Sequence, residues 1–68
     1  MEHLWDAIAL AKGQSLRSGT NRYVKQIHGL WIVETAPSGI KVIKVQGHLV
    51  TTLRHDGAGW YPAYYWPL

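Results

Sequence analysis

The sequence predicts an α+β domain in which a short N-terminal helix packs on four or five antiparallel strands. Two patterns predict it: apolar residues recur near 3.6-residue spacing in residues 2–12, and apolar and polar residues alternate in short runs from residue 22 onward. Glycine-containing turns separate those runs, as is typical of strands joined by hairpins. With 68 residues the chain is long enough for one core only, so residues 1–68 are predicted to form a single domain.

The helix is predicted over residues 2–12. It is too short to be stable alone, so Trp5 and Ile8 are expected to dock on the rest of the domain. Gly13 is suited to the left-handed conformation that ends many helices. Residues 13–21 contain one apolar side chain among polar and glycine residues, and they are predicted to form a polar loop.

The rest of the chain is predicted to form a β-meander over residues 22–66. Its strands are expected at residues 22–28, 30–36, 40–46, 48–54 and 60–66. In the third strand the alternation slips, because Ile40 and Val42 share one face whereas Ile43 and Val45 share the other. That slip indicates either a β-bulge or a strand buried on both faces. The strands then form either a twisted sheet or a small SH3-like barrel.

The composition excludes several classes of protein. Cysteine is absent, which excludes a disulfide framework, a thiolate nucleophile and a Cys-based zinc site. No apolar run is long enough to span a bilayer, and the N-terminal residues lack the positive-then-apolar order of a signal peptide. We therefore expect a cytoplasmic protein that makes no membrane contact and carries no cofactor.

Patterns that would indicate catalysis or metal binding are weak. No serine lies in a G-x-S-x-G context. Asp56 directly follows His55, and because adjacent residues of a strand point to opposite faces, the two are poorly placed to act together. His28 and His48 could approach His55 in a meander, but no His-x-His or His-x-x-x-His pair occurs. We therefore expect neither an enzyme nor a metal site.

Basic and aromatic residues carry the strongest functional signal. Residues 12–44 contain six basic residues and one acidic residue, and a basic face attracts nucleic acid or an acidic protein surface. Strand alternation places Trp31 opposite its apolar neighbours, so it is expected at the surface beside Lys41 or Lys44. Proteins that bind single strands combine such rings with cations. We nevertheless favour a core or half-core position for Trp5, Trp31 and Trp60, because the chain contains no Phe and few other large residues to build a core.

The C-terminal segment, residues 60–68, is rich in Trp and Tyr. Alternation places Tyr61 and Tyr65 on one face of the last strand and Tyr64 on the other. Pro62 confines this strand to a sheet edge. Because Tyr and Trp are frequent interface anchors, the segment is expected either to close the core or to bind a protein partner, including a second copy in a homodimer.

A pattern of turn glycines and apolar pairs runs through residues 27–54. Its members are His28-Gly29, Ile32-Val33, Gly39, Val42-Ile43, Gly47 and Thr51-Thr52. The pattern resembles short, uncharacterised β-rich domains of bacteriophage proteins. The resemblance implies a β-rich fold and an origin in a phage or mobile element, hence the cytoplasm of a bacterial host. It implies no activity.

We expect a non-enzymatic binding protein that acts by occupying a surface of a larger macromolecule. One concrete form is a phage-encoded, anti-CRISPR-like inhibitor whose partner is a host protein or ribonucleoprotein complex. The residues expected to contact the partner are Arg17, Arg22, Lys25, Lys41 and Lys44, with the aromatic Trp31, Tyr61, Tyr64 and Tyr65. The alternative function is a small β-barrel that binds single-stranded RNA or DNA through its basic face.

Overall fold

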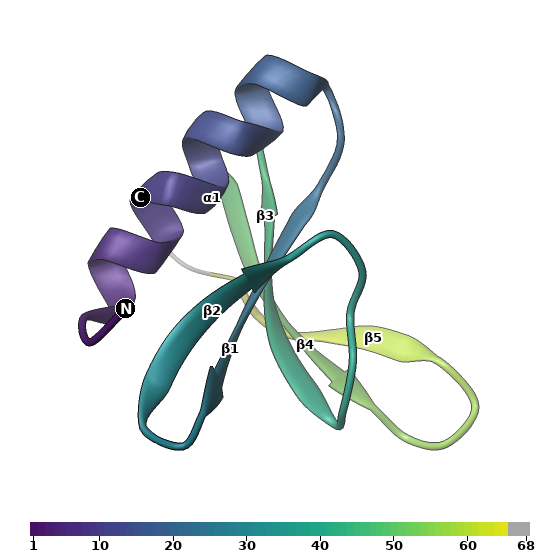
Figure 1. The fold of residues 1–68 in the computed structure, drawn as a ribbon. Helices are drawn as coiled ribbons and strands as arrows, with labels where there is room; N and C mark the ends of the chain where they lie inside the picture. Colours follow the sequence, from purple (N-terminus) through teal and green to yellow (C-terminus); the bar gives the residue numbers. More distant parts are fainter. Residues whose placement is uncertain (66–68) are drawn as a thin grey trace.

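A computed structural model gives one α-helix followed by five β-strands (Figure 1). The structure describes residues 1–65 and the side chains of residues 1–63. The elements are α1 (Leu4–Ser18), β1 (Arg22–Ile27), β2 (Leu30–Glu34), β3 (Lys41–Gln46), β4 (Leu49–His55) and β5 (Trp60–Tyr65). The predicted α+β class is confirmed, and the strands lie close to their predicted ranges. The predicted end of the last strand, at residue 66, lies outside the described residues.

The five strands form one antiparallel sheet in the order β2-β1-β3-β4-β5. Because β2 and β5 are edges, the sheet is open, and the SH3-like barrel that the sequence also allowed is not formed. The order departs from a simple meander at one place, since β1 lies between β2 and β3. The connecting residues 35–40 therefore cross β1. They cross on the face opposite α1, where Ser38 contacts the side chain of Lys25 (Figure 1).

Two-residue turns set the register of two hairpins. His28 and Gly29 both have positive φ, 51° and 81°, which makes the β1–β2 turn type I′. In the β3–β4 turn Gly47 has φ 59° and His48 does not have positive φ, as in type II′. These turn types match the right-handed twist of the strands that they join. They fix which residues lie opposite each other along both hairpins.

The helix is longer than predicted, because it continues from the expected range, residues 2–12, through most of the expected loop, residues 13–21. Its left-handed cap is Gly19, with φ 72°, whose N–H donates to the carbonyl oxygen of Ser15 at 2.9 Å. Gly13 lies inside the helix and does not cap it. The helix has 15 residues, and in the described part of the chain no helix is long and apolar enough to cross a membrane.

Tertiary contact explains the extra turns of α1. Ser15 is buried, and its hydroxyl oxygen accepts a hydrogen bond of 2.8 Å from the backbone N–H of Gly47 in the β3–β4 turn. A buried N–H without a partner is costly, so this bond favours helix at Ser15. At Gly13 a Cβ would meet only the tip of the Arg17 side chain, so close packing does not demand glycine there.

The core lies between α1 and the face of the sheet formed by β1, β3 and β4. It consists of Ala7, Ile8, Ala11, Val24, Ile43, Val45 and Val50, with Leu4, Trp31 and Val33 packed against it. Val42 is also buried, on the opposite face of β3, which confirms that this strand is buried on both faces. The register shift of the sheet lies elsewhere, between Thr52 and Leu53 where β4 meets β5.

The two helix residues that were expected to dock behave differently. Ile8 is 1% exposed and docks as predicted, whereas the prediction for Trp5 is wrong, since it is 61% exposed. The buried face of α1 is formed by residues spaced three or four apart: Ala7, Ile8, Ala11 and Ser15. Trp5 lies outside that face because it follows Leu4, which packs against the core, by one residue and is therefore rotated about 100° around the helix from it. Trp60 is half-buried, and its ring packs edge-on against the imidazole of His55 with centroids 4.9 Å apart.

Candidate functional site

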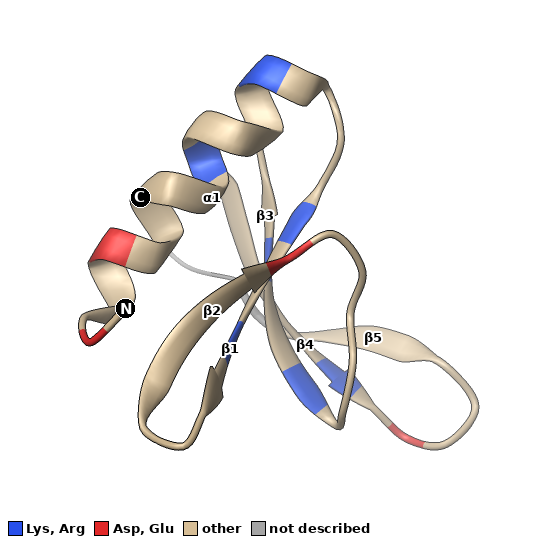
Figure 2. Cartoon of the chain, in the orientation of Figure 1, with Lys and Arg blue, Asp and Glu red and all other residues tan. Residues whose placement is uncertain are grey.

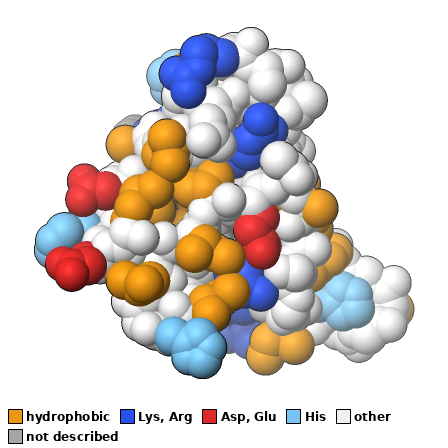
Figure 3. Space-filling model, viewed as in Figure 1, with side chains coloured by type: hydrophobic (Ala, Val, Ile, Leu, Met, Phe, Trp, Pro, Cys, Tyr) orange, Lys and Arg blue, Asp and Glu red, His pale blue; other side chains and the backbone are white. Residues whose placement is uncertain are grey.

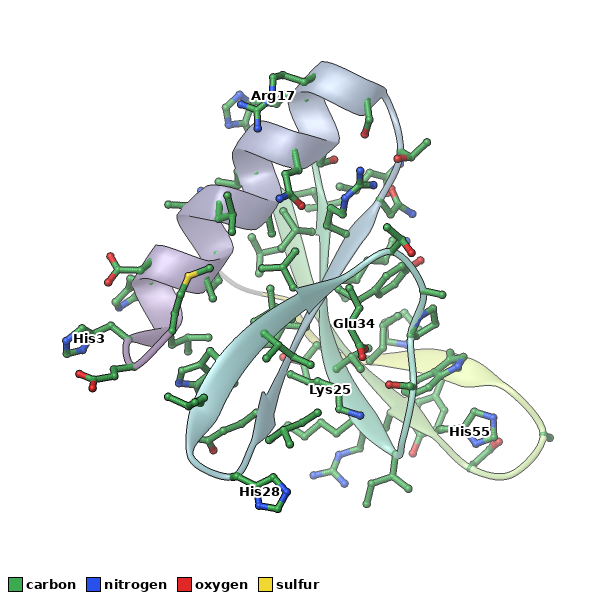
Figure 4. The ribbon with its side chains drawn as sticks, viewed as in Figure 1. His3, Arg17, Lys25, His28, Glu34 and His55 are labelled. Carbon is green, nitrogen blue, oxygen red and sulfur yellow. The ribbon has the colours of Figure 1, made fainter. Side chains whose placement is uncertain are left out.

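The five basic residues expected at the partner surface do not share one face of the molecule (Figure 2). Arg17 lies in the last turn of α1, far from Lys25 in Figure 4. Lys25 and Lys44 alternate with buried Val24 and Val45 neighbours, so they lie on the face of the sheet opposite α1. Arg22 and Lys41 lie on the α1 side and each begins its strand, so they lie at opposite ends of the antiparallel pair β1–β3.

Arg22 has structural partners. Its Nε donates to Oε1 of Gln14 at 3.2 Å, and one terminal nitrogen donates to Oγ1 of Thr20 at 2.7 Å and to the carbonyl oxygen of Asn21 at 3.1 Å. These bonds join the last turns of α1 to the start of β1. They leave the guanidinium of Arg22 less available to a partner.

Lys25 is engaged with the loop that crosses β1. Its Nζ donates to Oγ of Ser38 at 2.9 Å, and that hydroxyl donates to Oε2 of Glu34 at 3.0 Å. Figure 4 shows Lys25 and Glu34 close together beside this loop. The three side chains pin the crossover to the sheet, with a cation and an anion bridged by a hydroxyl group. Lys25 is therefore half-buried and partnered.

Five side chains, one from each strand, form a row across the face of the sheet on which α1 packs. Gln26 lies opposite Trp31, Lys41 opposite Arg54, and Arg54 opposite Tyr61. The β1–β3 pairing ends at Val24 and Ile43, so Gln26 and Lys41 are not paired, but both line the same pocket on this face. We call these five residues the sheet-face row. Its two basic members, Lys41 and Arg54, lie on the neighbouring strands β3 and β4.

Four members of the sheet-face row are exposed, and Trp31 is half-buried. Among the described residues, the backbone of α1 lies near β1, β2 and β3 and does not closely approach the backbone of β4 or β5. A pocket of about 390 Å³ lies where the helix begins, lined by Trp31, Gln26 and Lys41 with Leu4 of α1. Lys41 and Arg54 are both exposed. Within the described part of the chain neither cation makes a hydrogen bond or an ion pair.

Trp31 sits on the core side of the sheet, which confirms the expected core or half-core position and not the exposed position that alternation also suggested. It is half-buried and packs against the core, while Leu30 on the other face is 48% exposed. Alternation was assigned correctly, but the hydrophobic character of Leu30 and Ile32 suggested the wrong face. The backbone of Trp31 is also held at the sheet edge, where it exchanges two hydrogen bonds of 2.6 and 2.7 Å with Met1. Trp31 is nevertheless in the same pocket as Lys41, as expected.

Two members of the row, Gln26 and Arg54, were missed in the sequence. The signal for Arg54 was present, because a two-residue turn at 47–48 places it opposite Lys41. Tyr61 is 43% exposed and lies at the far end of the row. The backbones of Tyr64 and Tyr65 belong to β5, opposite two threonines of β4. The roles expected of these two side chains lie outside the described residues.

Apolar side chains form a second exposed surface. Figure 3 shows them gathered over the N-terminal half of α1 and the β1–β2 hairpin, with acidic side chains on either side. Exposed Trp5 and Leu30 belong to these elements, and exposed Met1 precedes α1. No three His, Asp or Glu side chains of the described residues gather closely enough to hold a metal ion.

The β4–β5 loop is organised by Asp56. Its Oδ1 accepts hydrogen bonds from the backbone N–H groups of Ala58 at 2.9 Å and Gly59 at 3.1 Å. These bonds stabilise the carboxylate and lower the pKa of Asp56 below its ordinary value of 3.8. Nδ1 of His55 accepts a further bond, from the N–H of Gly57. Asp56 and His55 therefore order a turn.

The lowered pKa of Asp56 predicts an acid-dependent loss of stability. Since the pKa is lower in the folded than in the unfolded chain, the contribution is present above pH 3.8 and is lost as pH falls through the folded value. Urea unfolding across this range compares wild type with Asp56→Asn, which keeps an oxygen acceptor but does not titrate. We expect the advantage of the wild type over the variant to shrink on acidification. A difference that stays constant down to about pH 2 contradicts this assignment.

Comparison of the chain with protein-family models, with curated proteins and with solved structures finds no match. A functional conclusion therefore rests on the geometry of this chain.

Proposed function

We propose that the protein is a non-enzymatic binding protein that engages an anionic surface of a larger macromolecule through its sheet-face row. One observation carries the proposal: Lys41 and Arg54 lie directly opposite each other, exposed, and have no hydrogen-bonding or ionic partner among the described residues. Like charges at opposed positions of a sheet are destabilising. An anion bound between them turns that repulsion into two charge-assisted contacts.

The aromatic members of the row support a binding role. Trp31 and Tyr61 lie at its two ends, on the edge strands β2 and β5. Trp, Tyr and Arg are the residue types that most often dominate binding energy at interfaces. A surface that sets two rings on either side of a cation pair offers both area and charge to a partner.

Several side chains of the types that serve in catalysis are engaged in structural hydrogen bonds. Ser15 holds the β3–β4 turn, Ser38 bridges Lys25 to its carboxylate partner, and Asp56 orders the β4–β5 loop. A nucleophile needs a base and an oxyanion pocket that are free to act on a substrate. These engagements favour binding over catalysis.

The phage origin implied by the pattern over residues 27–54 gives the proposal one concrete form. In it, the protein is an inhibitor that occupies a host ribonucleoprotein complex of a defence system. The sheet-face row would then cover, or take the place of, a contact that involves nucleic acid.

Charge reversal at matched sites tests the proposal. The variant Lys41→Glu/Arg54→Glu changes the row, whereas Arg17→Glu/Lys44→Glu changes two cations elsewhere, and each pair lowers the formal charge of +3 by the same amount. We expect the first variant to elute from an immobilised polyanion at clearly lower salt than the second. Circular dichroism shows whether both remain folded. Equal elution of two folded variants means that binding follows net charge and that the row is not the binding surface.

A further inference from the structure

We propose that the ligand of the sheet-face row is a single-stranded nucleic acid, an inference that rests on the proposed function and names its ligand class. The row offers, in order across the sheet, an indole, an amide, an ammonium, a guanidinium and a phenol: Trp31, Gln26, Lys41, Arg54 and Tyr61. Each group matches one part of a nucleotide chain. No member of the row carries a negative charge.

The two central cations suit phosphate groups. Lys41 and Arg54 are direct cross-strand neighbours, so their Cα atoms lie about 5 Å apart. A guanidinium presents a planar fork of donors to phosphate oxygens, while an ammonium acts as a compact charge. Both side chains are exposed, so their ends can follow a flexible backbone.

The rings and the amide suit unpaired bases. Trp31 is held by core packing and by the backbone bonds to Met1, yet part of it lines the open pocket of about 390 Å³. A base can stack there, because stacking on aromatic rings accepts every base. Gln26 is exposed between Trp31 and Lys41, where its amide can both donate to and accept from a base edge. Tyr61 offers a second ring beyond the cation pair.

A single strand fits these features better than a duplex or an acidic protein. In a duplex the base faces are stacked inside, so neither Trp31 nor Tyr61 could reach one. An acidic protein segment would satisfy Lys41 and Arg54 but makes no use of a half-open indole pocket beside them. Proteins that bind single strands without sequence preference also place aromatic rings beside basic side chains.

Fluorescence titration of the whole protein with oligothymidine at low ionic strength tests the inference. We expect quenching of tryptophan emission, with less quenching in Trp31→Phe, which keeps a ring in the core. Tyr61→Ala is expected to weaken binding by about 5- to 150-fold. Tyr61→Phe should bind like the wild type, because stacking needs the ring and not the hydroxyl. Lys41→Ala should weaken binding, whereas Lys44→Ala, on the other face of the same strand, should not.

Two other ligands separate failure of this inference from failure of the proposed function. If a duplex of the same sequence binds as tightly as the single strand, the inference is wrong. A second outcome is that polyglutamate binds as tightly as the oligonucleotide does. If that binding is weakened by loss of Lys41 and Arg54 but not by Tyr61→Ala, the ligand class is an acidic protein, and only the proposed function stands. If neither the oligonucleotide nor polyglutamate binds at low ionic strength, both proposals are wrong.

Discussion

Replacement of Ile8 by alanine is expected to lower the free energy of unfolding by about 2–5 kcal/mol. Ile8 is 1% exposed and is the only large buried side chain on α1, where the other buried residues are alanines and a serine. A domain of 68 residues has a total stability of about 3–10 kcal/mol, by the usual value per residue. The substitution therefore removes a large share of that stability and weakens the docking of α1.

Urea unfolding followed by circular dichroism measures this effect. Leu16→Ala is the matched control, because Leu16 lies on the same helix and is 54% exposed. We expect the midpoint of Leu16→Ala to stay near that of the wild type while that of Ile8→Ala falls steeply. Similar midpoints for the two variants would mean that the core is not centred on Ile8.

Local patterns in the sequence predicted most of the fold. Two-residue glycine turns and alternation specify the hairpins, because turn type and register are set by residues next to each other in the chain. The burial of β3 on both faces was also visible, in the slip at Val42 and Ile43. What the sequence did not show depends on contacts between distant segments. The continuation of α1 past Gly13 rests on Ser15 meeting Gly47, 32 residues away.

The strand order and the choice between the two faces open to Trp31 also depend on contacts between distant segments. Whether β2 or β1 lies next to β3 depends on the crossover, which is pinned by Ser38 between Lys25 and Glu34. Periodicity showed that Trp31 and Leu30 face opposite sides, but only the position of α1 decides which side is the core. The separation of Lys41 from Lys44, in contrast, was visible in the sequence, because residues three apart in one strand point to opposite faces.

Part of the candidate site could be predicted from the sequence. Trp31, Lys41 and Tyr61 were predicted; the register places Tyr61 next to Arg54 and Arg54 next to Lys41, and Lys41 and Trp31 line one pocket. Arg54 was accessible through the turn at 47–48, because the register of a tight hairpin can be counted from its turn. Gln26 carried no signal, since an exposed glutamine in a strand is ordinary. Its place beside Trp31 and Lys41 depends on β1 lying between their two strands.

Loss of the two central cations is expected to change how binding depends on salt. Each phosphate neutralised on a single strand contributes about 0.7 to the slope of log affinity against log salt concentration, through release of counterions. Lys41→Ala/Arg54→Ala should therefore reduce that slope by about 1.4, in addition to weakening binding at low salt. Lys44→Ala is the control, because Lys44 lies on the opposite face of β3.

The salt dependence of oligothymidine affinity is the most direct test of the claim that the sheet-face row binds a polyanion. It is measured for the wild type, Lys41→Ala/Arg54→Ala and Lys44→Ala under identical conditions. The geometry predicts a shallower slope, by about 1.4, for the double variant alone. The claim is contradicted if the double variant keeps the slope of the wild type, or if Lys44→Ala reduces the slope by as much as the double variant does.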